Sequence, residues 1–89
     1  MKFYDRERQV TYEIENSTVL ISYENKTIGD CPIIQDMTEC GTQYINFKGP
    51  NSVIEAIEID RNKIIHIRIL SDENSFFGTK SLQTILEKD

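Results

Sequence analysis

Hydrophobic and polar residues alternate along much of the chain, and the alternation is densest over residues 53–70. Two apolar runs, 53–59 and 64–70, flank a polar tip at 60–63. Isoleucine and valine are β-branched, and they fit a pleated surface better than a helix. In the second run Ile65, Ile67 and Ile69 occupy every other position. This pattern predicts a central β-hairpin in which these three isoleucines form the buried face of the second strand.

The length of the hairpin loop decides which side chains share a face. A two-residue loop would pair Glu55 with Arg68 and would place Glu58 opposite Ile65. A three-residue loop shifts the pairing by one residue, so that the isoleucines of both strands lie together and Glu58 lies beside His66. Burial of several isoleucines outweighs exposed ion pairs worth about 0–1 kcal/mol. We therefore expect the odd-length loop with a bulge, and a surface histidine.

A second hairpin is predicted over residues 10–23, with a turn at Asn16-Ser17. A two-residue turn places all six apolar side chains on one face, and the opposite face is mostly polar. The expected cross-strand pairs are Ile14 with Val19, Tyr12 with Ile21, and Val10 with Tyr23.

The other strands are marked less clearly. Residues 1–8 suit a short edge strand or a loose arm, and residues 27–43 look irregular, with a short strand at 33–34 and a turn at 36–40. A strand is expected at 44–48 with Ile45 and Phe47 pointing inward. Residues 49–52, Gly-Pro-Asn-Ser, are typical of a turn.

The C-terminal segment has helical spacing. Leu82, Ile85 and Leu86 would lie on one helical face, and Thr79 or Ser81 would cap a short helix that runs to the end of the chain. We therefore predict an α+β, mainly β fold over residues 1–89 as a single domain. It has a five- or six-stranded, largely antiparallel, curved and barrel-like sheet with one short C-terminal helix.

Composition narrows the function classes. The net charge is −5 and the pI is about 4.8, which argues against direct nucleic-acid binding because phosphate contacts need clustered Lys and Arg. The sequence contains no run of about 18 apolar residues, so no membrane span is predicted. The charged N-terminus does not resemble a secretory signal. The expected localisation is cytoplasmic. Heavy use of Ile, Asn, Lys and Glu suggests an AT-rich bacterial or phage genome.

Residues with catalytic potential are few. Cys31 and Cys40 are the two cysteines and His66 is the one histidine. A thiol–imidazole pair would require one cysteine beside His66, but nothing local places them together, and the cysteine spacing does not match a zinc site. No metalloprotease, hydrolase, EF-hand or phosphate-loop motif occurs. We therefore expect no enzyme activity, no metal and no cofactor.

The candidate binding residues are acidic and aromatic. Acidic side chains on solvated strand faces suit a basic partner, and the two consecutive phenylalanines before the predicted helix suit an exposed anchor or a plug for the open end of the sheet. The residues are Glu13, Glu15, Glu24, Glu58, Asp60, Phe76 and Phe77.

Two functions follow as hypotheses. The first is a small acidic non-catalytic interaction protein, an inhibitor or immunity-type binder of a basic protein surface. The alternative is a small-ligand or nucleotide-binding module that works as a homo-oligomer. A homodimer is considered under both hypotheses, because an 89-residue domain buries little surface.

Overall fold

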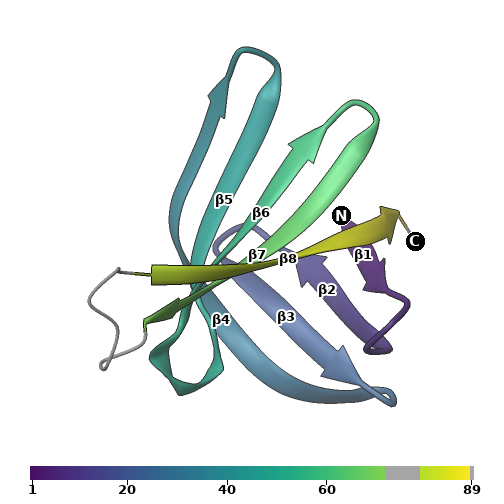
Figure 1. The fold of residues 1–89 in the computed structure, drawn as a ribbon. Helices are drawn as coiled ribbons and strands as arrows, with labels where there is room; N and C mark the ends of the chain where they lie inside the picture. Colours follow the sequence, from purple (N-terminus) through teal and green to yellow (C-terminus); the bar gives the residue numbers. More distant parts are fainter. Residues whose placement is uncertain (72–78, 89) are drawn as a thin grey trace.

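The computed structural model describes residues 1–71 and 79–88, which form a closed antiparallel barrel of eight strands (Figure 1). Each strand pairs with the next along the chain, and the first pairs with the last. The strands are β1 (Lys2–Asp5), β2 (Val10–Ile14), β3 (Thr18–Tyr23), β4 (Lys26–Glu39), β5 (Thr42–Lys48), β6 (Ile54–Asp60), β7 (Lys63–Ser71) and β8 (Thr79–Lys88), with a 3₁₀ turn, η1 (Pro50–Ser52), between β5 and β6. The mainly β prediction is confirmed, but the expected strand number of five or six is wrong.

The predicted register of the β2–β3 hairpin is confirmed. Ile14 pairs with Val19, Tyr12 with Ile21 and Val10 with Tyr23. Side chains of both strands reach the interior, where Tyr12 is buried. Strict alternation and a short turn fix this register, since slipping by one residue would turn the apolar side chains to solvent.

Residues 27–43 are a strand and a tight turn, which corrects the prediction of irregular structure. The first half of β4 pairs with β3 and the second half pairs with β5, so one strand turns the corner of the barrel. The pairing shifts on both sides of this corner, and Ile34 is left unpaired, as expected where bulges help a sheet to bend. Cys40 and Gly41 form the β4–β5 turn with φ values of 52° and 83°.

The predicted C-terminal helix is wrong, because residues 79–88 form β8. This strand pairs with β7 over residues 79–86, and its last two residues pair with Phe3 and Tyr4 of β1. Leu86 is buried and Ile85 is exposed, so neighbouring side chains point to opposite faces, as in a strand. A short helix has little stability alone, whereas β8 satisfies the free edges of β1 and β7 together.

The central hairpin exists, but its predicted register is wrong. Asp60 pairs with Lys63 across a two-residue loop, and Glu55 pairs with Arg68. Glu58 therefore lies opposite Ile65. The expectation that burial of isoleucine sets the register is wrong, because the barrel interior accommodates the Glu55 carboxylate beside His66 and Arg68.

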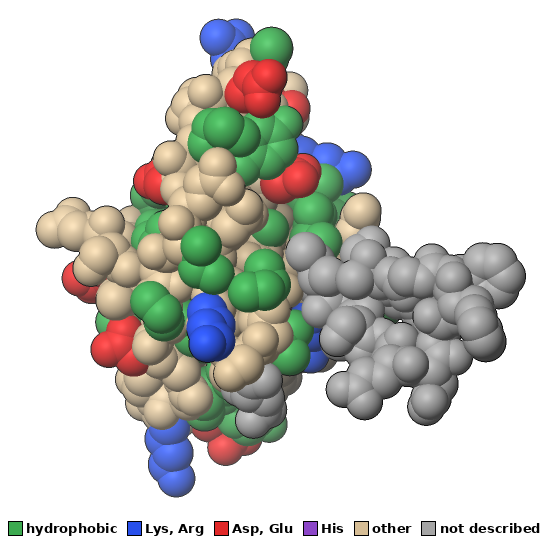
Figure 2. All heavy atoms as spheres, turned by 90° about the vertical axis from the view of Figure 1, so that its left-hand side faces the viewer, with side chains coloured by type: hydrophobic (Ala, Val, Ile, Leu, Met, Phe, Trp, Pro, Cys, Tyr) green, Lys and Arg blue, Asp and Glu red, His purple; other side chains and the backbone are tan. Residues whose placement is uncertain are grey.

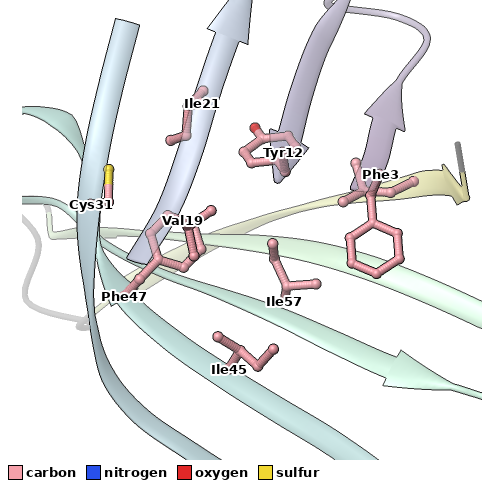
Figure 3. Packing of buried hydrophobic residues seen from close by; sticks show 9 residues of the cluster. Phe3, Tyr12, Val19, Ile21, Cys31, Ile45, Phe47 and Ile57 are labelled. Carbon is pink, nitrogen blue, oxygen red and sulfur yellow. The ribbon is translucent and has the colours of Figure 1, made fainter. Parts of the chain in front are cut away.

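Side chains from every strand of the barrel fill the interior. Figure 3 labels eight of these side chains. Eight-stranded barrels are just wide enough for side chains to fill their centre. Ile45 and Phe47 are fully buried, as predicted from their alternation. The buried hydrophobic residues are Phe3, Tyr12, Val19, Ile21, Cys31, Ile45, Phe47, Ile57 and Leu86. None of the described residues forms a helix with the length and apolarity needed to cross a membrane.

Candidate functional site

Strand β7 has the reverse of the usual arrangement, because it turns a polar side chain to the interior and hydrophobic side chains to the outer face. His66 is buried and Ile64 packs against the core, so the alternation of the strand turns Ile65 and Ile67 outward. An antiparallel sheet with one solvated face normally places polar residues there. This inversion produces two features: isoleucines on the outer surface and a polar cluster inside.

One of these outward isoleucines, Ile65, belongs to a row that crosses five strands. Lateral pairing joins β4 to β5, β5 to β6, β6 to β7 and β7 to β8 at successive positions. Four apolar or aromatic side chains lie along this row with one carboxylate at its centre. In order across the sheet they are Met37, Tyr44, Glu58, Ile65 and Ile85; we call them the outer row.

Both ends of the outer row are open to solvent. Met37 is 42% exposed and Ile85 is 64% exposed, while Tyr44, Glu58 and Ile65 are partly exposed. Figure 2 shows one side of the molecule, on which hydrophobic side chains lie at the surface among polar and charged ones. Single exposed apolar residues are ordinary, but a contiguous row is typical of an interaction surface.

The polar cluster inside the barrel is centred on Glu55. Glu55 and His66 are each 1% exposed, and His66 Nε2 lies 2.7 Å from Glu55 Oε1. Because a carboxylate only accepts, Nε2 carries a proton and donates it. Nδ1 of His66 lies 3.5 Å from the hydroxyl of Tyr12, and Arg68 Nε lies 3.7 Å from Glu55 Oε1. One buried carboxylate thus faces a histidine and an arginine.

Gly49 provides the space for this carboxylate. A Cβ atom at position 49 would overlap Glu55 Oε2 and would lie 2.7 Å from its Cδ. The 49–53 turn is held by the Gly49 amide, which donates to the carbonyl of Val53 at 2.7 Å. The glycine predicted only as a turn residue is therefore also required for the polar cluster.

The buried setting changes two ionisable groups. Burial, with help from the charges of Glu55 and Asp5, raises the pKa of Tyr12 from 10.0 to about 12. Tyr12 therefore remains protonated at neutral pH and can donate its hydroxyl proton to His66 Nδ1. Burial, followed by the charges of Glu55 and Asp30, also raises the pKa of the Cys31 thiol, so the thiolate that a nucleophile needs is disfavoured.

The thiol–imidazole pair, for which the sequence offers no local support, does not occur among the side-chain hydrogen bonds of His66 in the described part of the chain. Cys31 is buried, Cys40 is exposed at the β4–β5 turn, and both are free thiols. Among the described residues the imidazole of His66 hydrogen-bonds to the side chains of Tyr12 and Glu55 only. The expected surface position of His66 beside Glu58 is wrong, because the two-residue loop turns the histidine inward. No group of three or more potential metal ligands occurs within residues 1–71 and 79–88.

The predicted acidic residues do not form one patch. Glu13 and Glu24 line a groove of about 390 Å³ on the outer face of β1–β3, together with Lys2 and Tyr4. Glu15 is exposed beside the β2–β3 turn. Glu58 is in the outer row, and Asp60 is at the β6–β7 turn, where its Oδ1 accepts a hydrogen bond from the Arg61 amide at 2.6 Å. Phe76 and Phe77 lie outside the described residues.

A further buried carboxylate was not singled out by the sequence. Asp5 is fully buried, and its Oδ1 accepts a hydrogen bond from the Arg8 amide at 3.1 Å. Within the described part of the chain its Oδ2 accepts no hydrogen bond, although Arg8 Nε lies 3.9 Å away. The sequence feature that could have identified Asp5 is its spacing: it lies two residues after Phe3 and therefore on the same side of the strand.

Comparisons with protein-family models, curated proteins and solved structures found no match for this chain. Its function is therefore argued from its own residues.

Proposed function

We propose that this chain is a non-catalytic interaction protein that binds a basic protein partner through the outer row and inhibits that partner by covering it. The observation that carries the proposal is the inverted strand β7, which turns Ile65 to the surface next to Glu58. Apolar anchors around a charge that is desolvated on binding are typical of the centre of an interface.

The charge of the chain indicates the chemistry of the partner. The net charge is −5, and Glu58 is the one charged member of the outer row. Charge complementarity raises association rates and suppresses wrong partners. We therefore infer a partner surface with an apolar strip and a Lys or Arg that meets Glu58.

A second copy of the chain fits this row less well. In a two-fold symmetric dimer the same patch meets itself, and an axis near the middle of the row would bring the two Glu58 carboxylates together. Like charges brought together in an interface are unfavourable. A different protein with a positive charge at that position avoids this repulsion and pairs with Glu58 instead.

The test is affinity capture from cells that express the gene, with the wild-type chain and matched variants as baits. Glu58→Lys and Ile85→Asp alter the outer row, whereas Glu15→Lys changes charge equally at an exposed position outside it. We expect a basic protein that is captured by the wild type and by Glu15→Lys, and that is lost with both outer-row variants. Removing one member of an interfacial charge pair costs about 2–5 kcal/mol, or roughly thirtyfold or more in Kd.

Several results would count against the proposal. Loss of the captured protein with Glu13→Lys or Glu24→Lys, but not with Glu58→Lys, would move the site to the groove on β1–β3. A dimer in light scattering that Ile85→Asp dissociates would show that a second copy covers the row. A captured partner whose activity is unchanged at saturating concentrations of the chain would reject the inhibitory role.

A further inference from the structure

The barrel is open at one end, and this opening is separate from the outer row. A cavity of about 410 Å³ lies at the end of the barrel that carries the β4–β5 and β6–β7 turns. Phe3, which is 1% exposed, contributes to its floor together with the partly buried Ile59 and Ile64. Small-molecule sites are typically cavities of about 300–1,000 Å³ with apolar walls, and the mouths of barrels are one of their usual places.

The strand register explains why this end is hollow. Thr38 pairs with Gln43, Gln43 with Ile59, and Ile59 with Ile64, so four lining residues are lateral neighbours on the inward side of four strands. On β5 and β6 the next inward positions are Ile45 and Ile57, which are fully buried in the core. The core therefore closes the cavity below, and Thr38 and Gln43 add hydrogen-bonding groups to one wall.

The charges around this opening differ from those of the rest of the chain. Arg61 and Lys88 line the cavity, with Asp60 as the acidic residue among its lining side chains. A neighbouring hollow of about 280 Å³ is also lined by these three residues, and it adds Lys63. In a chain of net charge −5, cations gather at the rim of an apolar recess.

The nearby acids are engaged in other contacts. The Asp60 carboxylate accepts the Arg61 amide hydrogen at 2.6 Å. Asp36 does not line the cavity, but it accepts a hydrogen bond from Gln43 Nε2 at 3.0 Å. Asp60 keeps its negative charge, but Arg61 and Lys88 outnumber it among the lining side chains, so the rim of the cavity carries a net positive charge.

We propose that this opening is a binding site for a small amphiphilic carboxylate, with the hydrocarbon part on Phe3, Ile59 and Ile64 and the carboxylate beside Arg61 and Lys88. Because the core closes the cavity below, the site takes a short acyl chain or a single aromatic ring. The proposal goes beyond the interaction function and does not depend on it.

The probe is octanoate, titrated into the purified chain by isothermal titration calorimetry at low ionic strength. Arg61→Glu and Lys88→Glu each reverse one rim charge, and Lys26→Glu makes the same change at the β3–β4 turn as the matched control. Surface charge pairs contribute little individually, so each rim reversal should weaken octanoate binding by about fivefold, and the two together by more than tenfold. Lys26→Glu should leave the affinity within about twofold, and Thr38→Trp should abolish binding by filling the cavity.

An uncharged probe separates the roles of the tail and the carboxylate. 1-Octanol has the same hydrocarbon chain, and we expect it to bind more weakly than octanoate. Absence of octanoate binding, equal affinity for 1-octanol, or equal effects of the rim and control reversals would each overturn the proposal. Thermal unfolding of every variant shows whether a loss of binding comes from a loss of folding.

Discussion

Replacing Gly49 by alanine is the sharpest test of the buried polar cluster. The added Cβ would overlap Glu55 Oε2 and would lie 2.7 Å from its Cδ, closer than non-bonded heavy atoms can approach. Either the carboxylate or the 49–53 turn must move. Since the Gly49 amide is hydrogen-bonded to the carbonyl of Val53, we expect the Glu55 carboxylate to move and to lose its 2.7 Å contact with His66.

The magnitude follows from the burial of the pair. Glu55 and His66 are both 1% exposed, and moving the Glu55 carboxylate away from its partners leaves an uncompensated buried charge, which typically costs about 3–5 kcal/mol. A small domain has a total stability of about 5–15 kcal/mol. Gly49→Ala should therefore remove a large part of the stability and lower Tm by about 12–40 °C.

Urea unfolding followed by circular dichroism measures this loss, and two comparisons isolate its cause. Gly41 has φ +83° and no heavy atom within 4 Å of an added Cβ, so Gly41→Ala adds backbone strain without a clash and should cost about 1–2 kcal/mol. In a Glu55→Ala background the clashing oxygen is gone, and the nearest remaining contact is the Val53 carbonyl at 3.1 Å. There Gly49→Ala should cost about 1 kcal/mol or less.

If Gly49→Ala costs no more than Gly41→Ala, the Glu55 carboxylate is not seated over Gly49. The same conclusion follows if the cost of Gly49→Ala is the same with and without Glu55, because the two positions would then be energetically independent.

Three further outcomes are expected from the structure. The pKa of Tyr12 is raised from 10.0 to about 12, so between these two pH values only the unfolded state releases the tyrosine proton. About 3 kcal/mol of the free energy of unfolding should therefore be lost as the pH rises through this window. Urea titrations at about pH 9 and about pH 12 should show a smaller loss for Tyr12→Phe than for the exposed control Tyr23→Phe. The exposed thiol of Cys40 should react rapidly with a disulfide reagent in the native state, whereas the buried thiol of Cys31 should react only on unfolding. A rapid reaction that persists in Cys40→Ser would contradict the burial of Cys31. Cys40 has a φ of 52° and precedes glycine in a two-residue turn. Because Asn tolerates this conformation better than Cys, Cys40→Asn should stabilise the chain by about 0.5 kcal/mol in urea titrations. A loss of stability would argue against this turn.

The candidate sites were only partly visible in the sequence. Glu58 is predicted as a binding residue from its place on a solvated strand face, and the structure adds its apolar neighbours from β4, β5, β7 and β8. His66 was predicted at the surface and Glu55 was seen only as an interruption of an apolar face. Their contact depends on a register that differs by one residue from the expected one. The barrel-end cavity joins residues from both ends of the chain and from two hairpins, which no local pattern could associate.

Local pattern alone determined that the chain is mainly antiparallel β, and it fixed the register of the β2–β3 hairpin and the burial of Ile45 and Phe47. These features depend on alternation within a few residues, which is written directly in the sequence. Only the tertiary structure decided that residues 79–88 are a strand and that β7 turns its histidine inward. The reason is that both depend on distant partners: β8 is a strand because β1 and β7 offer it two free edges, and His66 is buried because Glu55, Tyr12 and the bare backbone of Gly49 make a polar place for it inside the closed barrel.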